Sequence, residues 1–365
     1  MTQDAPQLSI VVPTYNEREN VGIVVEKLAR ALQGVSWEVI FVDDDSKDGT
    51  ADAVRALSAR DPRVRVIQRL GRRGLSGACI EGMLASSAPF IGVMDADGQH
   101  DETRLPLMLD ALAQDKADIA VGTRFAGGGD TGDFGGARLA GSRLCTLAAQ
   151  RLLHIHLSDP MSGFFMIRRD KLMPLAHRLS SQGFKILLDI MATARGRLRV
   201  AEIPYSFGMR AHGESKMDAM AVMDFLGLLV AKATRDAVPV RFFFFLLVGG
   251  AGLVVNLIVL KLELGLFGAS FAAAQAIAVF VAMTFNFFLN NTVTYRSQRL
   301  HGVKNILRGL LSSYAVWSIG GLANVAVATE AYRILPVWWL AAAIGAVMGS
   351  VWNYITSTFF VWRAR

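Results

Sequence analysis

Long apolar runs fill the C-terminal third of this sequence, and they constrain the fold more than any other feature. The lipid bilayer offers no water to satisfy backbone polar groups, so a run of about 20 apolar residues is typical of a membrane-spanning helix. Up to about Pro239, polar and apolar stretches instead alternate at lengths that are normal for a globular domain. We predict that the chain crosses a membrane at 242–260, 269–289, 309–329 and 337–361.

The charges between these spans predict their orientation. The connection between the second and third spans carries four basic residues, whereas the turns inside each pair of spans balance one base against one acid. Loops rich in Lys and Arg remain in the cytoplasm. We therefore expect a multi-pass protein of the cell membrane, with the globular domain and both chain ends cytoplasmic. The N-terminal residues do not have the charge and apolar pattern of a signal peptide.

The membrane half contains an internal repeat. The segments FNFFLNNTVTYR, from Phe285, and WNYITSTFFVWR, from Trp352, both begin aromatic-Asn-aromatic and end aromatic-Arg, at an offset of 67 residues. The same offset carries the start of the first span onto the third, which indicates two helical hairpins in tandem. Interhelical hydrogen bonding and a polar path or lipid-headgroup site are both open interpretations of the asparagines in or near the spans. These are Asn256, Asn286, Asn324 and Asn353.

The globular half alternates short apolar segments with longer segments of helical character. Strand and helix in alternation predict an α/β fold with a mainly parallel sheet wound by crossover helices. Such sheets bind ligands at the carboxyl ends of their strands. The predicted strands are 8–12, 38–42, 64–67, 90–94 and 118–121.

Polar side chains follow the first, second and fourth of these strands, in the segments PTYNE, DDDS and DADGQ. If the extended geometry continued past Met94, then Asp95, Asp97 and Gln99 would point to the same side. Carboxylate and amide oxygens suit Mg2+ or Mn2+, and Mg2+ typically uses one or two carboxylates plus substrate phosphates. We therefore predict a divalent cation that binds a pyrophosphate leaving group.

A dinucleotide cofactor does not fit the glycine pattern. A Rossmann dehydrogenase needs a glycine-rich phosphate turn after its first strand, whereas the glycine-rich stretch here, GRRGLSGA, follows the third strand. A Walker-type loop is absent from the sequence as well. The strand-end carboxylates therefore remain as the predicted means of holding a nucleotide diphosphate.

Eight segments occur in the order, and at roughly the spacing, of a known family between about Leu8 and Lys216: PTYNE, VDDDS, GLSGA, DADGQH, VGTRF, DPMSGFFMIRR, FKILLDI and RAHGESK. As a set they resemble glycosyltransferase family 2 enzymes of the dolichol-phosphate (polyprenyl-phosphate) mannosyltransferase type. The four-span half is similar to GtrA-like membrane domains. The resemblance implies a Rossmann-like GT-A catalytic domain over 1–214, and a GtrA-like all-α transmembrane domain of four helices over 240–365.

The segment between these domains, 215–239, begins with a helical stretch that is too polar to span a membrane. We interpret it as an interfacial juxtamembrane helix and linker. The alternative is a last helix that packs on the catalytic domain.

The resemblance implies an enzyme that transfers a sugar from a nucleotide sugar to a polyprenyl phosphate at the cytoplasmic membrane face, with inversion. The leading expectation is mannose from GDP-mannose, which gives polyprenyl-phosphate-mannose and GDP. One alternative is the same reaction with a UDP-sugar, such as glucose or an amino sugar, and undecaprenyl phosphate. Another is a flippase or transporter of lipid-linked sugar. We expect no nucleic-acid partner.

The resemblance also assigns roles to residues. The segments after the first two strands would hold the base and ribose. The family often has two acids where VDDDS has three, so Asp43, Asp44 and Asp45 are alternatives; we favour Asp44 from the position of the following serine. The residues expected to bind the nucleotide sugar are Pro13, Tyr15, Glu17, Asp44, Gly74, Asp95, Ala96, Arg210 and Lys216.

Asp95, Asp97 and Gln99 are expected to hold the metal ion, Mg2+ or Mn2+, and the diphosphate. Arg138 and Arg143 would bind the lipid phosphate, or else attract anionic lipid. The expected catalytic residues are Asp97, Arg124, Arg138 and Arg143.

A lipid phosphate is already an anion, so we predict no obligatory general base and assign the catalytic work to the metal and to cationic side chains. Asp159, in SDPMSG, is the alternative base, and its other interpretation is a structural turn or helix cap. His100 follows the acidic cluster, and we expect it to contact the metal ligands rather than the metal.

Overall fold

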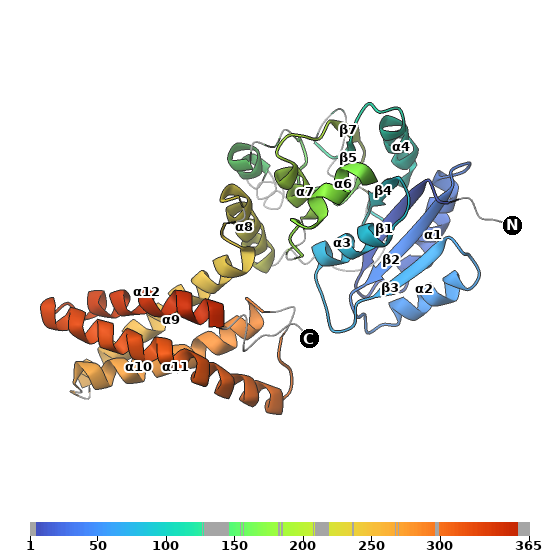
Figure 1. The fold of residues 1–365 in the computed structure, drawn as a ribbon. Helices are drawn as coiled ribbons and strands as arrows, with labels where there is room; N and C mark the ends of the chain where they lie inside the picture. The colour runs from blue at the N-terminus through green and yellow to red at the C-terminus, as the bar shows by residue number, and fades with distance from the viewer. Residues whose placement is uncertain are drawn as a thin grey trace. The chain divides into compact units, whose positions relative to one another are not determined.

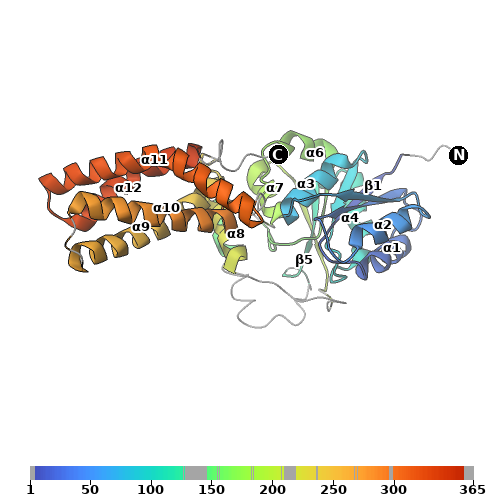
Figure 2. The ribbon, with the colours of Figure 1, turned by 90° about the horizontal axis from the view of Figure 1, so that it is seen from below.

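The computed structural model divides into two compact units, Met1–Ala237 and Val238–Arg365. The first is an α/β unit and the second is a bundle of long helices (Figures 1 and 2). The structure describes residues 5–125, 127, 146–153, 155, 157–181, 183, 185–206, 208, 219–235, 237–266, 268, 270–295 and 299–356.

The first unit is built on a seven-stranded sheet of order β3-β2-β1-β4-β6-β5-β7. All the neighbouring strands are parallel except β6, which is antiparallel to both β4 and β5. The five predicted strands and the mainly parallel sheet are confirmed, while β6 and β7 were not predicted. The strands are β1 Leu8–Thr14, β2 Trp37–Asp43, β3 Val64–Gln68, β4 Phe90–Val93, β5 Ile119–Thr123, β6 Phe165–Arg168 and β7 Val200–Pro204.

Helices cover both faces of this sheet, so its central strands β1 and β2 are buried on both sides. Successive side chains of β1 point to opposite faces: Ile10 and Val12 join the cluster that contains Leu28 of α1 and Met108 of α4, whereas Val11 joins the cluster of α3 and α7. The helices of this unit are α1 Asn20–Ala31, α2 Thr50–Ser58, α3 Leu75–Ala85, α4 Leu105–Ala113, α6 Arg169–Ala176, α7 Ile186–Ala194 and α8 Ala219–Ala233, with the short η1 Glu102–Arg104 before α4.

Helix α8 falls inside the segment that the sequence left between two interpretations. Its inner face packs into the same core cluster as α7, with Phe225 and Leu228 at most 5% exposed. A buried ion pair joins the two helices, with Lys232 Nζ 2.8 Å from Asp189 Oδ1. The outer face is apolar as well, since Met223 and Leu226 are exposed. This helix therefore has one face packed on the α/β unit and one apolar face outward.

The second unit contains α9 Val240–Leu266, α10 Phe271–Thr292, α11 Val303–Ile334 and α12 Trp338–Thr356. Helix α9 packs mainly on α10, and α11 mainly on α12, as two tandem hairpins would. In the part of the chain that the structure describes, three helices are long and apolar enough to cross a membrane: Phe242–Leu266, Phe271–Thr292 and Val303–Ile334. The fourth predicted span overlaps α12, and its last residues lie outside the described part of the chain.

Candidate active site

The strand order places the polar segments of the sequence along one edge of the sheet. Strand β1 lies between β2 and β4 and is parallel to both, so the residues that follow these three strands are neighbours. Because β6 runs in the opposite direction between β4 and β5, the residues that precede β6 reach the same edge. The segment 157–164 therefore meets the ends of β4 and β5.

The segment DADGQ forms a turn rather than a continuation of β4. The strand ends at Val93, and the chain turns through Gly98, whose φ is +74°. Asp97 stabilises this turn, since its Oδ1 accepts a hydrogen bond from the Gln99 N–H at 3.1 Å. The chain is therefore not extended past Met94, and the alternation of a strand does not set the directions of the Asp95, Asp97 and Gln99 side chains.

Asp95 is contacted by His100, which is itself held by residues from two other parts of the chain. His100 Nε2 lies 3.2 Å from Asp95 Oδ2, and His100 Nδ1 lies 3.1 Å from the Tyr205 hydroxyl oxygen. The His100 ring also stacks on Phe164, with 5.1 Å between the ring centroids. His100 is therefore placed to orient the Asp95 carboxylate. Burial raises the pKa of Tyr205, so its hydroxyl remains protonated near neutral pH.

Gly163 provides the space that Asp95 occupies. A Cβ atom at this position would lie 2.8 Å from Asp95 Oδ2, closer than real Cβ contacts come. The residue lies just before β6, in the motif DPMSGFFMIRR, and no residue pattern predicted its contact with Asp95. Its place in the turn before an antiparallel strand brings it there.

The donor chemistry of this turn fits a hard divalent cation. Asp95 and Asp97 supply carboxylate oxygens, and Gln99 adds an amide whose Nε2 donates to the Gly208 carbonyl oxygen at 3.1 Å. Within the described ranges, no three His, Cys, Asp or Glu side chains form a group that could hold a metal ion. A cation at this turn would therefore rely on two carboxylates together with substrate phosphates, as Mg2+ often does.

The three consecutive acids after β2 have different surroundings. Asp43 is fully buried and accepts hydrogen bonds from the Ser46 N–H and hydroxyl at 3.1 and 2.5 Å. Asp44 pairs with Arg69 and accepts from the Gly74 N–H at 2.6 Å. Burial raises the pKa of Asp44, although the bonds from Gly74 and Arg69 act in the opposite direction.

These contacts tie the loops after β2 and β3 together at the proposed nucleotide end. Asp44, which we favoured for nucleotide contact, is already engaged with Arg69 and Gly74. The sequence did not predict a role for Arg69, since a base after a strand is common and its partner lies 25 residues away.

The segment after β1 offers an exposed aromatic ring. Tyr15 is 40% exposed, and the Arg73 guanidinium carbon lies 4.5 Å from its ring centroid. Glu17 accepts a hydrogen bond from Asn20 Nδ2 at 2.6 Å, while Pro13 lies inside β1. Tyr15 is therefore the accessible member of this group.

Arg124, after β5, makes a bidentate ion pair with Asp159. Nε lies 2.6 Å from Oδ2, and Nη2 lies 3.0 Å from Oδ1. Burial acts to lower the pKa of Arg124, but the bonds and charge of Asp159 outweigh it and raise that pKa. Asp159 is completely buried. Its geometry favours the positioning of Arg124 over the general-base role.

Of the remaining predicted site residues, two lie in the described part of the chain and four lie outside it. Ala96 is buried within the turn after β4, and Gly74 has a φ of +138° that favours glycine. Arg138, Arg143, Arg210 and Lys216 lie outside the described residues.

Two family models match separate parts of the chain. The model described as "Glycosyl transferase family 2" matches residues 9–175, and the model described as "GtrA/DPMS, transmembrane domain" matches residues 244–362. The two matches fall in the α/β unit and the helical unit, respectively. The fold and the matches define the class of protein as a glycosyltransferase joined to a helical membrane domain.

Curated relatives extend the match. A dolichol-phosphate mannosyltransferase of Pyrococcus furiosus is 32% identical over 363 residues, which cover 98% of this chain and 99% of the relative. The chain therefore belongs to the dolichol-phosphate mannosyltransferase family within glycosyltransferase family 2. Relatives of the same name from Mycosarcoma maydis and Saccharomyces cerevisiae are 35% and 34% identical over 63% and 60% of this chain, and over 80% and 84% of their own lengths.

Among solved structures, part of the chain is similar to a glucosyl-3-phosphoglycerate synthase from Mycobacterium tuberculosis. That structure was solved in complex with Mn2+, uridine diphosphate and glucosyl-3-phosphoglycerate. The sequence identity is 20% and the TM-score is 0.49, over 63% of this chain and 80% of that chain.

Proposed function

We propose that this protein transfers mannose from GDP-mannose to a polyprenyl (dolichyl-type) phosphate, with inversion, and releases polyprenyl-phosphate-mannose and GDP. The observation that carries the proposal is the 32% identity over 98% of the chain to the mannosyltransferase of Pyrococcus furiosus, which includes both units. On one edge of the sheet, the carboxylate turn supplies oxygen ligands for a cation that would bind the diphosphate, and Arg124 supplies a cationic group for a second phosphate.

In the proposed reaction, a phosphate oxygen of the lipid attacks the anomeric carbon of mannose. The bond between that carbon and the diphosphate breaks, and GDP leaves with the electron pair. Asp95, Asp97 and Gln99 would hold Mg2+ or Mn2+, which when bound neutralises charge on the leaving diphosphate. Asp95 is oriented by His100, and the space beside it is kept by Gly163.

Cationic side chains would hold the acceptor. Arg124 is fixed by Asp159, so its guanidinium has a defined place for a phosphate group. Arg138 and Arg143 would bind the lipid phosphate, and Arg210 and Lys216 the donor diphosphate. Because the nucleophile is already an anion, the reaction proceeds without a side-chain base.

The donor's base and ribose would lie at the ends of β1 and β2. Tyr15 offers an exposed ring, and the loop contacts of Asp44 with Gly74 give this end a fixed shape. Pro13, Glu17 and Ala96 complete the proposed nucleotide site.

The helical unit would cross the membrane four times, with α12 as the fourth span. The α/β unit and both chain ends would lie in the cytoplasm, because the connection between α10 and α11 is rich in basic residues. Domain limits at 1–214, 215–239 and 240–365 are part of this proposal.

The test is sugar transfer by the purified full chain in detergent. The assay supplies polyprenyl phosphate, Mg2+ or Mn2+, and in turn GDP-mannose, UDP-glucose and UDP-N-acetylglucosamine. We expect lipid-linked mannose from GDP-mannose alone, loss of product with a chelator, and at least a roughly 100-fold loss in Asp97→Asn. Asp52→Asn, a change of a largely exposed carboxylate on α2, is the matched control. Product from a UDP-sugar would replace GDP-mannose as the proposed donor. Absence of product from every donor would refute the proposed sugar transfer.

A further inference from the structure

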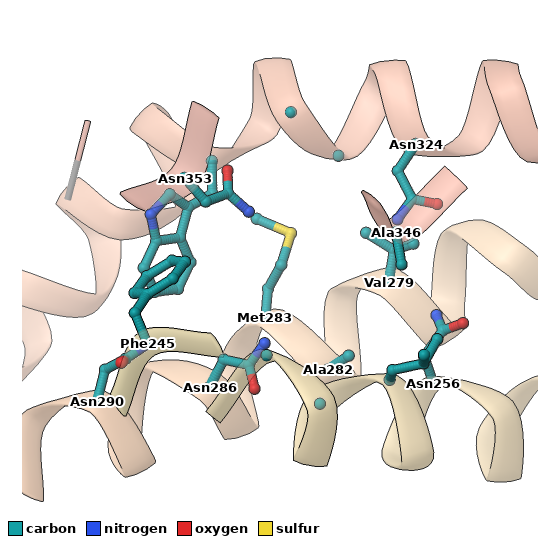
Figure 3. Close-up of a pocket in the computed structure, with 16 residues that line it drawn as sticks. Phe245, Asn256, Val279, Ala282, Met283, Asn286, Asn290, Asn324, Ala346 and Asn353 are labelled. Atoms are coloured by element: carbon teal, nitrogen blue, oxygen red, sulfur yellow. The ribbon is translucent and has the colours of Figure 1, made fainter. Parts of the chain in front are cut away.

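The helical unit contains a partly open cavity whose described lining includes five asparagine side chains. It contains about 680 Å3 of empty space, part of which is open to the surroundings, and residues of α9, α10, α11 and α12 line it. Figure 3 shows Asn286, Asn290 and Asn353 toward one end, Asn256 and Asn324 toward the other, and Met283 between them.

Three of these amides have unsatisfied hydrogen-bonding capacity. The side-chain oxygens of Asn256, Asn286 and Asn353 are buried and have no hydrogen-bond partner within the described part of the chain. They come from α9, α10 and α12, and the Asn256 side chain belongs to a residue that is only 5% exposed. An unsatisfied buried carbonyl group costs free energy, and a bilayer provides no water to compensate. The cavity therefore presents acceptors that a ligand with hydrogen-bond donors would satisfy.

Two other amides at the cavity are already engaged. Asn324 Oδ1 accepts a hydrogen bond from Gln275 Nε2 at 3.0 Å, and Asn290 Oδ1 accepts one from the Thr294 hydroxyl at 2.7 Å. These bonds show how amides in this bundle are satisfied when a protein partner is available. Among the amides that line the cavity, Asn256, Asn286 and Asn353 are therefore the ones whose side-chain oxygens lack a described partner.

The internal repeat places the amides in related positions. Asn286 and Asn353 occupy the same place in the two repeated segments, 67 residues apart, and Asn256 and Asn324 lie at nearly the same offset in α9 and α11. Gly252 allows this arrangement, because a Cβ at that position would overlap the Asn286 side chain. Both hairpins therefore contribute an amide pair to one cavity, as the halves of repeat-built membrane sites do.

The lining suits the uncharged, hydroxyl-rich part of a ligand. The described residues around the cavity include no charged side chain, so a phosphate group would lack a counter-charge there. Hydroxyl groups donate to amide oxygens and accept from amide nitrogens. The buried rings of Phe245 and Trp317 add apolar surface of the kind that packs against a sugar ring.

We propose that this cavity binds the sugar of a lipid-linked monosaccharide, with the sugar hydroxyls bonded to Asn256, Asn286 and Asn353. The choice of lipid-linked mannose as ligand rests on the proposed function. The site itself rests on the unsatisfied amides and lies in the unit that the glycosyltransferase model does not match. The membrane unit would then recognise the product's sugar as well as anchor the enzyme.

The test is ligand-dependent tryptophan emission of the full chain in lipid nanodiscs. The probes are polyprenyl-phosphate-mannose, polyprenyl phosphate without sugar, and methyl mannoside. We expect a saturable change with the mannosyl lipid, absent with polyprenyl phosphate, and lost in Trp317→Phe because Trp317 lines the cavity. A response to methyl mannoside alone would also support a sugar site and would identify free sugar as its ligand.

Matched amide variants decide the role of the asparagines. Asn256→Leu and Asn286→Leu should each weaken the response at least tenfold, whereas Asn305→Leu should not change it, since Asn305 is exposed near the start of α11. If a leucine variant does not fold, Asn256→Ala removes the same amide without adding bulk. An equal response to sugar-free polyprenyl phosphate, or unchanged binding in the cavity variants, would overturn the proposal.

A transfer assay on the same samples keeps the two proposals separate. Active enzyme without a cavity response overturns the sugar site and leaves the proposed function intact. A saturable cavity response in protein that transfers no mannose overturns the proposed function instead.

Discussion

Arg124 and Asp159 form two parallel hydrogen bonds, with Nε to Oδ2 at 2.6 Å and Nη2 to Oδ1 at 3.0 Å. The Asp159 side chain is completely buried, and the Arg124 side chain is 10% exposed. A buried ion pair is costly to break from one side, because the remaining charge keeps its desolvation penalty without its partner. The pair therefore links the end of β5 to the segment before β6.

Asp159→Asn should lower the free energy of unfolding by roughly 3 kcal/mol, since it leaves the Arg124 charge uncompensated. Thermal or denaturant unfolding of the full chain measures this. The double variant Arg124→Gln/Asp159→Asn should lose less than the sum of the single variants, by about 0.5–3 kcal/mol. Asp52→Asn, at an exposed pair with Arg55, should change stability by less than about 0.5 kcal/mol. Additive losses would argue against the coupling.

The pH dependence of transfer distinguishes the two roles of Asp159. A positioning role predicts that Asp159→Asn lowers the rate and leaves the shape of the pH profile unchanged. Loss of the acidic limb of that profile in the variant would assign Asp159 as a base instead.

Gly163→Ala should impair transfer without unfolding the protein. The new Cβ would press on Asp95 Oδ2, at 2.8 Å, and displace a predicted metal ligand. A misplacement of about 1 Å can cost roughly 100-fold in rate. Steady-state transfer and the unfolding midpoint are measured together. Gly22→Ala, in α1 with open space around it, is the matched control and should keep full activity. Full activity in Gly163→Ala would contradict the proposed role of Asp95 as a metal ligand.

His100→Phe should weaken the response to metal. The ring can still stack on Phe164, but the contacts with Asp95 and Tyr205 are lost. Groups that orient a metal ligand typically contribute about 10–100-fold in metal affinity or activity. We expect the half-saturating concentration of Mg2+ or Mn2+ in the transfer assay to rise by about that factor. His177→Phe, at an exposed site after α6, is the control. An unchanged metal titration in His100→Phe would contradict the role.

Asp118 should make stability depend on pH in the acid range. Hydrogen bonds from Arg199, through its backbone N–H, Nε and Nη2, lower the pKa of Asp118 from 3.8 to about 2. The unfolded chain binds the proton more tightly, so this stabilisation is present above about pH 4 and is lost as the pH falls through about 2.

The size of this effect is on the order of 1–2 kcal/mol, because solvent around the half-exposed Arg199 screens the pair. Unfolding midpoints between pH 2 and 5 measure it, and Asp118→Asn should flatten that dependence. An equal pH slope in wild type and Asp118→Asn would contradict the assignment.

Local features of the sequence determined most of the elements. The apolar runs predicted the positions of α9, α10 and α11, because the length of a membrane span sets the length of the run. Alternating apolar segments predicted β1 to β5, and the rule for parallel sheets placed the residues after β1, β2 and β4 together. Asp95 and Asp97 were identified in this way from their place after a buried strand.

Only the tertiary structure decided the direction of β6. A short strand has no local signal for its direction, which depends on pairing with β4 and β5. That antiparallel pairing brings Asp159 to Arg124 and Gly163 to Asp95, contacts that sequence spacing could not indicate. The turn at Gly98 likewise replaced the extended geometry that would have pointed Asp95 and Asp97 to the same side.

For the asparagines of the helical unit, too, the sequence determined one part of the result and the tertiary structure another. The repeat in the sequence located Asn286 and Asn353, but left both interhelical hydrogen bonding and a ligand site open. The packed bundle distinguishes the two interpretations. Asn324 Oδ1 accepts a hydrogen bond from Gln275 Nε2 at 3.0 Å, whereas the buried side-chain oxygens of Asn286 and Asn353 have no described partner. Sequence determines which polar groups enter the bilayer, and helix packing decides which of them are satisfied, because each partner comes from a different helix.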